Sequence, residues 1–185
     1  MLDAEQRRTL LEIAAASIDH GLAHGRPLAV DPASYPEALQ TSGAAFVTLT
    51  REGELRGCIG SLEATRPLVE DIAQNAYGAA FRDPRFPPLS PAEREGLSIH
   101  ISVLTPPEPL EVDSEEALLA AMRPGVDGFV LQEGNRRGTF LPSVWESLPA
   151  PRDFLRHLKL KAGLPPDHWS DAIRIQRYTV EEIGD

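Results

Sequence analysis

The spacing of apolar residues along the chain predicts a mixture of helices and strands. Apolar positions three and four residues apart are typical of helices that bury one face. This spacing occurs in four segments, namely residues 4–23, 67–81, 115–122 and 152–162. Thr65 and Ser114 are the expected N-caps of the second and third of these helices. A further short helix is expected at Pro91, because Ser90 and Glu93 have the spacing of a capping box.

Strands are predicted where apolar and polar residues alternate. The segment "LSIHISVL", residues 97–104, places its aliphatic residues on one face and His100 on the other. Two β-hairpins are expected, one over residues 46–59 and one over residues 128–142, and a last strand is expected over residues 172–180. Because the elements do not alternate as regular βαβ units, we expect an α+β fold with mixed, largely antiparallel sheets and flanking helices. The length suits a single domain over residues 1–185, or two intertwined α/β subdomains within it.

Composition and charge exclude several classes of protein. The chain has no apolar run near the roughly 20 residues that span a bilayer. Its N-terminus lacks a basic segment followed by an apolar core, so we expect a cytoplasmic protein without membrane partners. The net charge of −10 repels phosphate backbones, so nucleic-acid binding is not expected.

The single cysteine, Cys58, lies in the segment "ELRGCIG", residues 54–60. One cysteine can form neither an intramolecular disulfide nor a multi-cysteine zinc site. Strict alternation along a strand would place Glu54, Arg56 and Cys58 on one face. It would place the flanking aliphatic residues, Leu55 and Ile59, on the opposite face, toward the core.

This arrangement supports two interpretations of Cys58. A guanidinium such as that of Arg56 favours the reactive thiolate, and Gly57 and Gly60 would let a ligand approach the backbone. Alternatively, Cys58 is a small buried hydrophobe, and the glycines mark a bulge or a tight bend. The sequence leaves both interpretations open.

Charged residues elsewhere provide further candidates for binding or catalysis. In "DPRF", Asp83 and Arg85 could form an ion pair that fixes the loop, or Arg85 could clamp an anion. Arg137 near a hairpin tip is either a solvated side chain or an anion contact. His100 could serve as a base for the thiol if the sheet brought the two together, or it could be an ordinary strand histidine.

Metal and cofactor sites are not predicted. His20 and His24 have the i,i+4 spacing of two metal ligands on a helix, but no third ligand is evident. The chain also lacks the glycine-rich phosphate-binding loop, the dinucleotide fingerprint and the nucleophile-elbow motif. Trp145 and Trp169 are expected in the core or in a lid.

Five segments together resemble the AMMECR family, protein A of the AmmeMemoRadiSam system. They are "LRGCIG" (55–60), "AAFRDPRF" (79–86), "ISVLTPPEPL" (101–110), "NRRGTFLPSVW" (135–145) and "FLRHLKLKAGL" (154–164). The resemblance implies two small lobes around a cleft near residues 55–60. It also implies a functional link with a Memo-type protein and a radical SAM enzyme. Family members often have a second cysteine where this chain has Lys159, which disfavours a mechanism that needs a disulfide between the two positions.

Three functions are consistent with these observations. The preferred one is an accessory role, in which the segment Leu55–Gly60 binds a small anionic ligand or a partner segment. Its expected contacts are Arg56, Gly57, Cys58, Gly60, Asp83, Arg85 and Arg137. The alternative is an enzyme with Cys58 as nucleophile or covalent carrier. In it, Arg56 would hold an acidic group of the substrate, and His100 or Glu54 would carry protons. The third is a scaffold that forms a homodimer through the edge of the first hairpin. The accessory role is preferred because the residues do not include a complete catalytic set.

Overall fold

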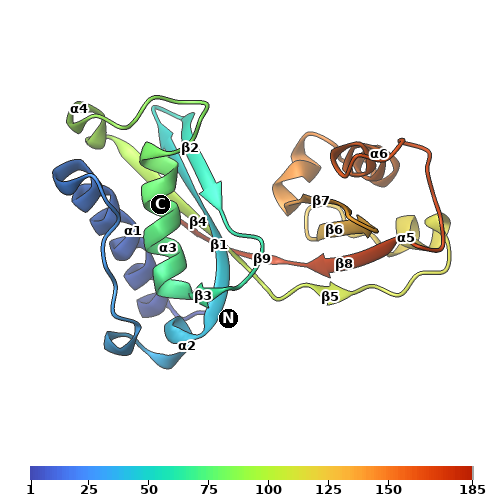
Figure 1. Cartoon of the computed structure of the whole chain (residues 1–185), viewed down its shortest axis with the longest axis horizontal. Helices are drawn as coiled ribbons and strands as arrows, with labels where there is room; N and C mark the ends of the chain where they lie inside the picture. Colours follow the sequence, from blue (N-terminus) through green and yellow to red (C-terminus); the bar gives the residue numbers. More distant parts are fainter. Residues whose placement is uncertain (185) are drawn as a thin grey trace. The chain divides into compact units, whose positions relative to one another are not determined.

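A computed structural model describes residues 1–184, which divide into two compact units. The first unit comprises Met1–Leu104 together with the C-terminal segment from Glu181, and the second comprises Thr105–Val180. Figure 1 shows that both units combine helices with strands. Every strand pair whose register is known is antiparallel, which confirms the expected α+β class.

The first unit has a sheet with helices packed on one of its faces. The strands lie in the order β2-β1-β4-β9, and β3 also pairs with β1. Helices α1 and α3 cover the same face of this sheet (Figure 1). The elements are α1 (Ala4–His24), η1 (Pro32–Ser34), α2 (Glu37–Gln40), β1 (Ser42–Arg51), β2 (Glu54–Gly60), β3 (Arg66–Pro67), α3 (Leu68–Phe81), α4 (Pro91–Arg94), β4 (Leu97–Leu104) and β9 (Val180–Gly184).

Alternation along β1 and β4 separates the core of this unit from the opposite face of the sheet. Val47 and Leu49 on β1 lie opposite Ile101 and Ile99 on β4, and all four are buried against the helices. His100 lies on the opposite face, as the alternation of residues 97–104 predicted. The sheet therefore has one apolar face, under the helices, and one that carries polar side chains.

Cap signals predicted two helix starts correctly and one incorrectly. Ser90 and Glu93 form the capping box of α4, and the Ser114 hydroxyl accepts a hydrogen bond at the start of α5 (Glu115–Ala121). Thr65 is not the cap of α3, because residues 66–67 instead form β3 and pair with the start of β1. The helix can begin only after this strand, so Pro67 occupies the N-cap position.

The second unit contains a smaller sheet in the order β5-β8-β6-β7. The predicted hairpin of residues 128–142 is confirmed as β6 and β7. Trp145 is buried, as expected, and its ring stacks on Phe154 with the centroids 3.9 Å apart. Besides α5, the elements are β5 (Glu108–Pro109), β6 (Gly128–Glu133), β7 (Arg136–Phe140), η2 (Pro142–Glu146), α6 (Pro151–Lys161) and β8 (Arg174–Tyr178).

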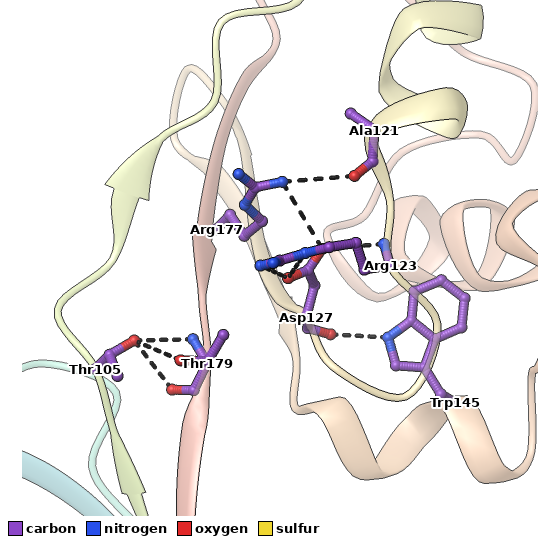
Figure 2. A network of polar contacts seen from close by, with 7 residues as sticks. All are labelled: Thr105, Ala121, Arg123, Asp127, Trp145, Arg177 and Thr179. Carbon is purple, nitrogen blue, oxygen red and sulfur yellow. Dashed lines mark hydrogen bonds and ion pairs between the residues drawn. The ribbon is translucent and has the colours of Figure 1, made fainter. Parts of the chain in front are cut away.

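A buried carboxylate fixes the loop that precedes β6. Figure 2 shows Arg123 and Arg177 converging on Asp127. Arg123 Nη2 lies 2.6 Å from Asp127 Oδ1, and the Asp127 carbonyl accepts a hydrogen bond of 2.8 Å from Trp145 Nε1. The buried carboxylate is stabilised by its arginine partners, of which Arg177 belongs to β8, and the backbone carbonyl binds Trp145 of the aromatic core. Asp127 therefore ties the loop to both.

The C-terminal strand β9 was not predicted. The sequence suggested a last strand over residues 172–180, whereas the structure has β8 in the second unit and then β9 in the sheet of the first. Ile183 joins the core of the first unit. Over residues 1–184, no helix combines the length and the apolar character that crossing a bilayer requires.

Candidate functional site

A β-bulge in β2 changes the face on which the residues before Cys58 lie. Cys58 is opposite Thr48 on β1. The register shifts by one residue between Leu49 and Thr50, so that Thr50 is opposite Leu55 instead of Arg56. Directly paired residues point to the same side of a sheet, so Leu55 and Cys58 share the face opposite the helices. The predicted alignment of Arg56 with Cys58 is therefore wrong, and Leu55 is 42% exposed instead of lying in the core.

Arg56, the extra residue of the bulge, binds the segment that follows α3. Its guanidinium is buried, with Nε 2.7 Å from Glu93 Oε2 and Nη2 2.8 Å from the Pro87 carbonyl oxygen. The hydrogen bond from Arg56 lowers the pKa of Glu93 to about 2. Arg56 thus joins β2 to residues 87–93, a structural task that the sequence did not suggest.

Both glycines of the motif make room for other parts of the chain. A Cβ atom added at Gly57 would lie 1.9 Å from the carbonyl oxygen of Ala79, so the backbone of α3 packs directly on β2. At Gly60 a Cβ atom would lie 2.1 Å from Cγ of Phe46, whose ring covers this position. The space that the sequence suggested for a ligand beside these glycines is occupied by the protein itself.

Cys58 is half-buried and is held through its backbone by Asp83. Its N–H donates a hydrogen bond of 3.0 Å to Asp83 Oδ2, and its Sγ lies 3.3 Å from Thr48 Oγ1. Since β2 is an edge strand, Asp83 also occupies an N–H group that would otherwise be open to another strand. The link between Asp83 and Cys58 spans 25 positions of sequence and was not predicted.

Asp83 also binds Arg85, which confirms the ion pair expected in "DPRF". Arg85 Nε lies 3.0 Å from Asp83 Oδ1, and Arg85 Nη2 lies 2.7 Å from Asp83 Oδ2. These hydrogen bonds hold the pKa of the buried Asp83 carboxyl far below its usual range. The same bonds raise the pKa of Arg85, and the Cys58 side chain adds a smaller effect in the same direction.

The Arg85 side chain is 55% exposed. The cation beside Cys58 is thus Arg85.

His100 lies on the same face of the sheet as Cys58 but on a more distant strand. Thr48 is opposite Cys58 on one side and opposite His100 on the other, so the two residues are about 10 Å apart along the sheet. His100 Nε2 lies 2.7 Å from Glu182 Oε2 on β9, which also accepts a hydrogen bond from Ser102. The structure therefore pairs His100 with Glu182 and Cys58 with Thr48.

The family model AMMECR1 matches residues 11–183, which is nearly the whole chain. The chain belongs to the AMMECR1 family. It is 39% identical over 186 residues to a protein of Methanothermobacter thermautotrophicus, a match that covers 97% of this chain and 94% of that protein. It is also 39% identical to a protein of Thermotoga maritima, over 89% of this chain and 90% of that one. The AMMECR1 fold is similar to the crystal structure of the uncharacterized protein PH0010 from Pyrococcus horikoshii, with a TM-score of 0.86, 34% identity, and coverage of 98% and 92%.

The remaining candidates of this AMMECR1 chain are Arg137, His20 and His24. Arg137 is an exposed residue of β7 in the second unit, opposite Gln132 on β6, and its role in binding stays a prediction. His20 and His24 lie next to each other on α1 with ring centroids 4.4 Å apart. In residues 1–184, no group of three or more potential ligating side chains is placed to hold a metal ion.

A buried polar cluster, which the sequence did not predict, anchors the chain just after Gly60. The buried Asp71 of α3 accepts hydrogen bonds from the Ala45 N–H (3.0 Å), Ser61 Oγ (2.7 Å) and Arg66 Nε (2.8 Å). Asn75, one helical turn later, donates to the Ala45 carbonyl. Two polar residues four positions apart within an apolar helical stripe could have indicated such a cluster, because buried polar groups require partners.

Proposed function

We propose that the chain is an accessory binding protein that holds an anionic group of a small ligand or of a partner segment. The site is the Cys58–Arg85 surface, which we define as Leu55, Cys58 and Arg85. One observation carries this proposal: a single buried carboxylate, Asp83, binds both the backbone of Cys58 and the guanidinium of Arg85. Asp83 compensates the charge of Arg85 and fixes its half-exposed guanidinium, whose remaining N–H groups can donate to a carboxylate or phosphate.

The hydrogen bonds around Cys58 favour binding over catalysis. A thiol that depends on a general base for activation needs that base in contact with it. The thiol bonds to Thr48, which is not a base at neutral pH, while His100 bonds to Glu182. The bonds from Arg85 to Asp83 use Nε and Nη2, and the exposed guanidinium has further N–H groups for an anion.

The partner that we propose is a Memo-type protein or a radical SAM enzyme. This part of the proposal follows from the resemblance to protein A of the AmmeMemoRadiSam system. An acidic segment of such a partner, or a small anion that both proteins contact, would supply the charge that Arg85 recognises. A role in presenting a ligand to another enzyme would not require a base beside Cys58.

Binding to the Memo-type protein of the same organism, measured by calorimetry, tests the proposal. We expect Arg85→Ala to weaken binding at least about tenfold, because a charge-assisted contact is lost. Cys58→Ser is expected to bind within about twofold of the wild type, since Ser retains the backbone N–H and a polar side chain. Arg8→Ala, which removes an exposed arginine of α1, is the control for the change in net charge.

Small anions give a second measurement with the same variants. Phosphate and citrate are titrated while the backbone amide signals of Cys58 and Arg85 are followed by NMR. The proposal would be reversed if Arg85→Ala bound the partner and these anions normally while Cys58→Ser lost binding. That result would favour the cysteine-dependent enzyme.

A further inference from the structure

A cavity of about 650 Å³ opens in the second unit, among residues that the proposed function does not use. Residues 109–113, 169–171 and 173–176 line it together with residues of β6. Its volume falls within the roughly 300–1,000 Å³ that small-molecule sites occupy. The lining residues that matter here are Trp169, Gln132, Glu111, Asp113, Asp171 and Arg174.

Trp169 forms an aromatic wall that its neighbours hold in place. The residues on either side of it bind the same carboxylate: His168 Nε2 lies 2.8 Å from Glu133 Oε2, and Ser170 Oγ lies 2.5 Å from that oxygen. These two hydrogen bonds lower the pKa of Glu133, with Ser170 as the larger cause. Both neighbours of Trp169 are thus tied to β6, which limits the backbone freedom of the residue that carries the ring.

A buried lysine lies against the same ring. Lys159 Nζ is 5.9 Å from the centroid of the Trp169 ring and 2.6 Å from Glu115 Oε1. Because Glu115 pairs with this ammonium, Lys159 adds no net charge to the surroundings of the cavity. The ammonium lies within the roughly 6 Å of the ring centroid that a cation–π contact requires.

The charged side chains of the lining are mostly acidic. The three acidic residues of the lining, Glu111, Asp113 and Asp171, are all exposed. The one cation, Arg174, is engaged with the backbone, because its Nη1 donates to the carbonyl oxygens of Asp171 (2.7 Å) and Ile173 (3.1 Å). A lining with more carboxylates than cations repels anions and attracts cations.

We propose that this cavity binds a small organic cation, an ammonium group that carries apolar substituents. The face of Trp169 would contact the substituents and the charge together, and the carboxylates at the rim would supply the long-range attraction. This site lies wholly within the second unit and prefers the opposite charge from the Cys58–Arg85 surface. It is therefore independent of the proposed function.

Choline and its neutral isostere 3,3-dimethylbutan-1-ol are the probes that test this inference. The full chain is titrated with each while the indole N–H of Trp169 and the side-chain amide of Gln132 are followed by NMR. We expect saturable shifts of both groups with choline, and binding of the neutral isostere about threefold to thirtyfold weaker, the range of one cation–π contact. Trp169→Phe should retain most of the preference for choline, and Trp169→Leu should lose it.

Two charge variants separate the rim from the rest of the surface. Asp171→Asn is expected to weaken choline binding about twofold to threefold, as the loss of one exposed carboxylate should. Glu146→Gln, which removes a carboxylate outside the cavity, should leave it unchanged. Equal binding of choline and its isostere, shifts confined to other residues, or no saturable shift with millimolar choline would overturn the inference.

Discussion

Replacing Asp83 by alanine is expected to destabilise the first unit by about 3 kcal/mol, because the N–H groups of Cys58 and Arg85 lose the buried carboxylate that accepts their hydrogen bonds. Asp83 is buried, and it accepts hydrogen bonds from the Cys58 N–H, the Arg85 N–H and the Arg85 side chain. Hydrogen exchange of the buried amides of β1 and β4 measures this loss in the first unit alone. Both tryptophans belong to the second unit, so their fluorescence would not report it.

Asp19→Ala is the matched control for Asp83→Ala. Asp19 also pairs with an arginine, Arg94, at 2.7 Å, but its side chain is 57% exposed. An exposed ion pair contributes about 0–1 kcal/mol, so this control should cost far less. Equal losses in the two variants would show that Asp83 does not anchor β2.

The contribution of Asp83 should depend on pH in a defined direction. Because folding lowers the pKa of this carboxyl, its stabilisation is fully present above the ordinary aspartate pKa of about 4. It is lost as the pH falls below that value toward the folded pKa. The difference in stability between the wild type and Asp83→Ala should therefore be larger at pH 7 than at about pH 3.

Gly57→Ala is expected to cost about 3 kcal/mol or more, or to prevent folding of the first unit. The added methyl group would lie 1.9 Å from the Ala79 carbonyl oxygen and 2.9 Å from its carbon. Both atoms belong to the backbone of α3, so the whole helix would have to move away from β2. The same hydrogen-exchange measurement, together with the yield of folded protein, checks this prediction.

Gly78→Ala, on the α3 side of the same contact, is the control for Gly57→Ala. A Cβ atom at Gly78 would lie 3.1 Å from Cγ2 of Ile59, a side-chain atom that can shift slightly. Alanine also favours a helix over glycine by about 1 kcal/mol. This variant should therefore stay within about 1 kcal/mol of the wild type. If Gly57→Ala were no worse than Gly78→Ala, the close approach of α3 to β2 would be contradicted.

Local signals in the sequence predicted most elements of the fold. The capping box of Ser90 and Glu93, the two hairpins and the alternation of residues 97–104 depend on residues close together in the chain, and the structure confirms them. The last strand, β9, was missed because its pairing joins the C-terminus to the sheet of the first unit. Thr65 failed as a cap for a similar reason, since pairing with β1 takes up the residues after it.

The candidate site was predicted only in part, and the bulge in β2 is the main reason. Alternation holds for Cys58 and Ile59 but fails at Leu55 and Arg56, because one extra residue reverses the faces. A bulge depends on the partner strand and is not visible in the apolar pattern. The pair of Asp83 and Arg85 was among the predicted alternatives, whereas its link to Cys58 requires the fold to bring α3 beside β2.

The charge selectivity of Cys58 alkylation tests most directly whether Asp83 holds Arg85 beside the thiol. Iodoacetate is anionic and iodoacetamide is neutral, and Cys58 is the only cysteine, so the ratio of their rates reports the charge near the sulfur. We predict that Arg85→Ala lowers the ratio of the iodoacetate rate to the iodoacetamide rate about threefold, because the substitution leaves the Asp83 carboxylate uncompensated. The control Arg8→Ala should leave this ratio unchanged. An unchanged or higher ratio in Arg85→Ala would contradict the anion-binding site at the Cys58–Arg85 surface.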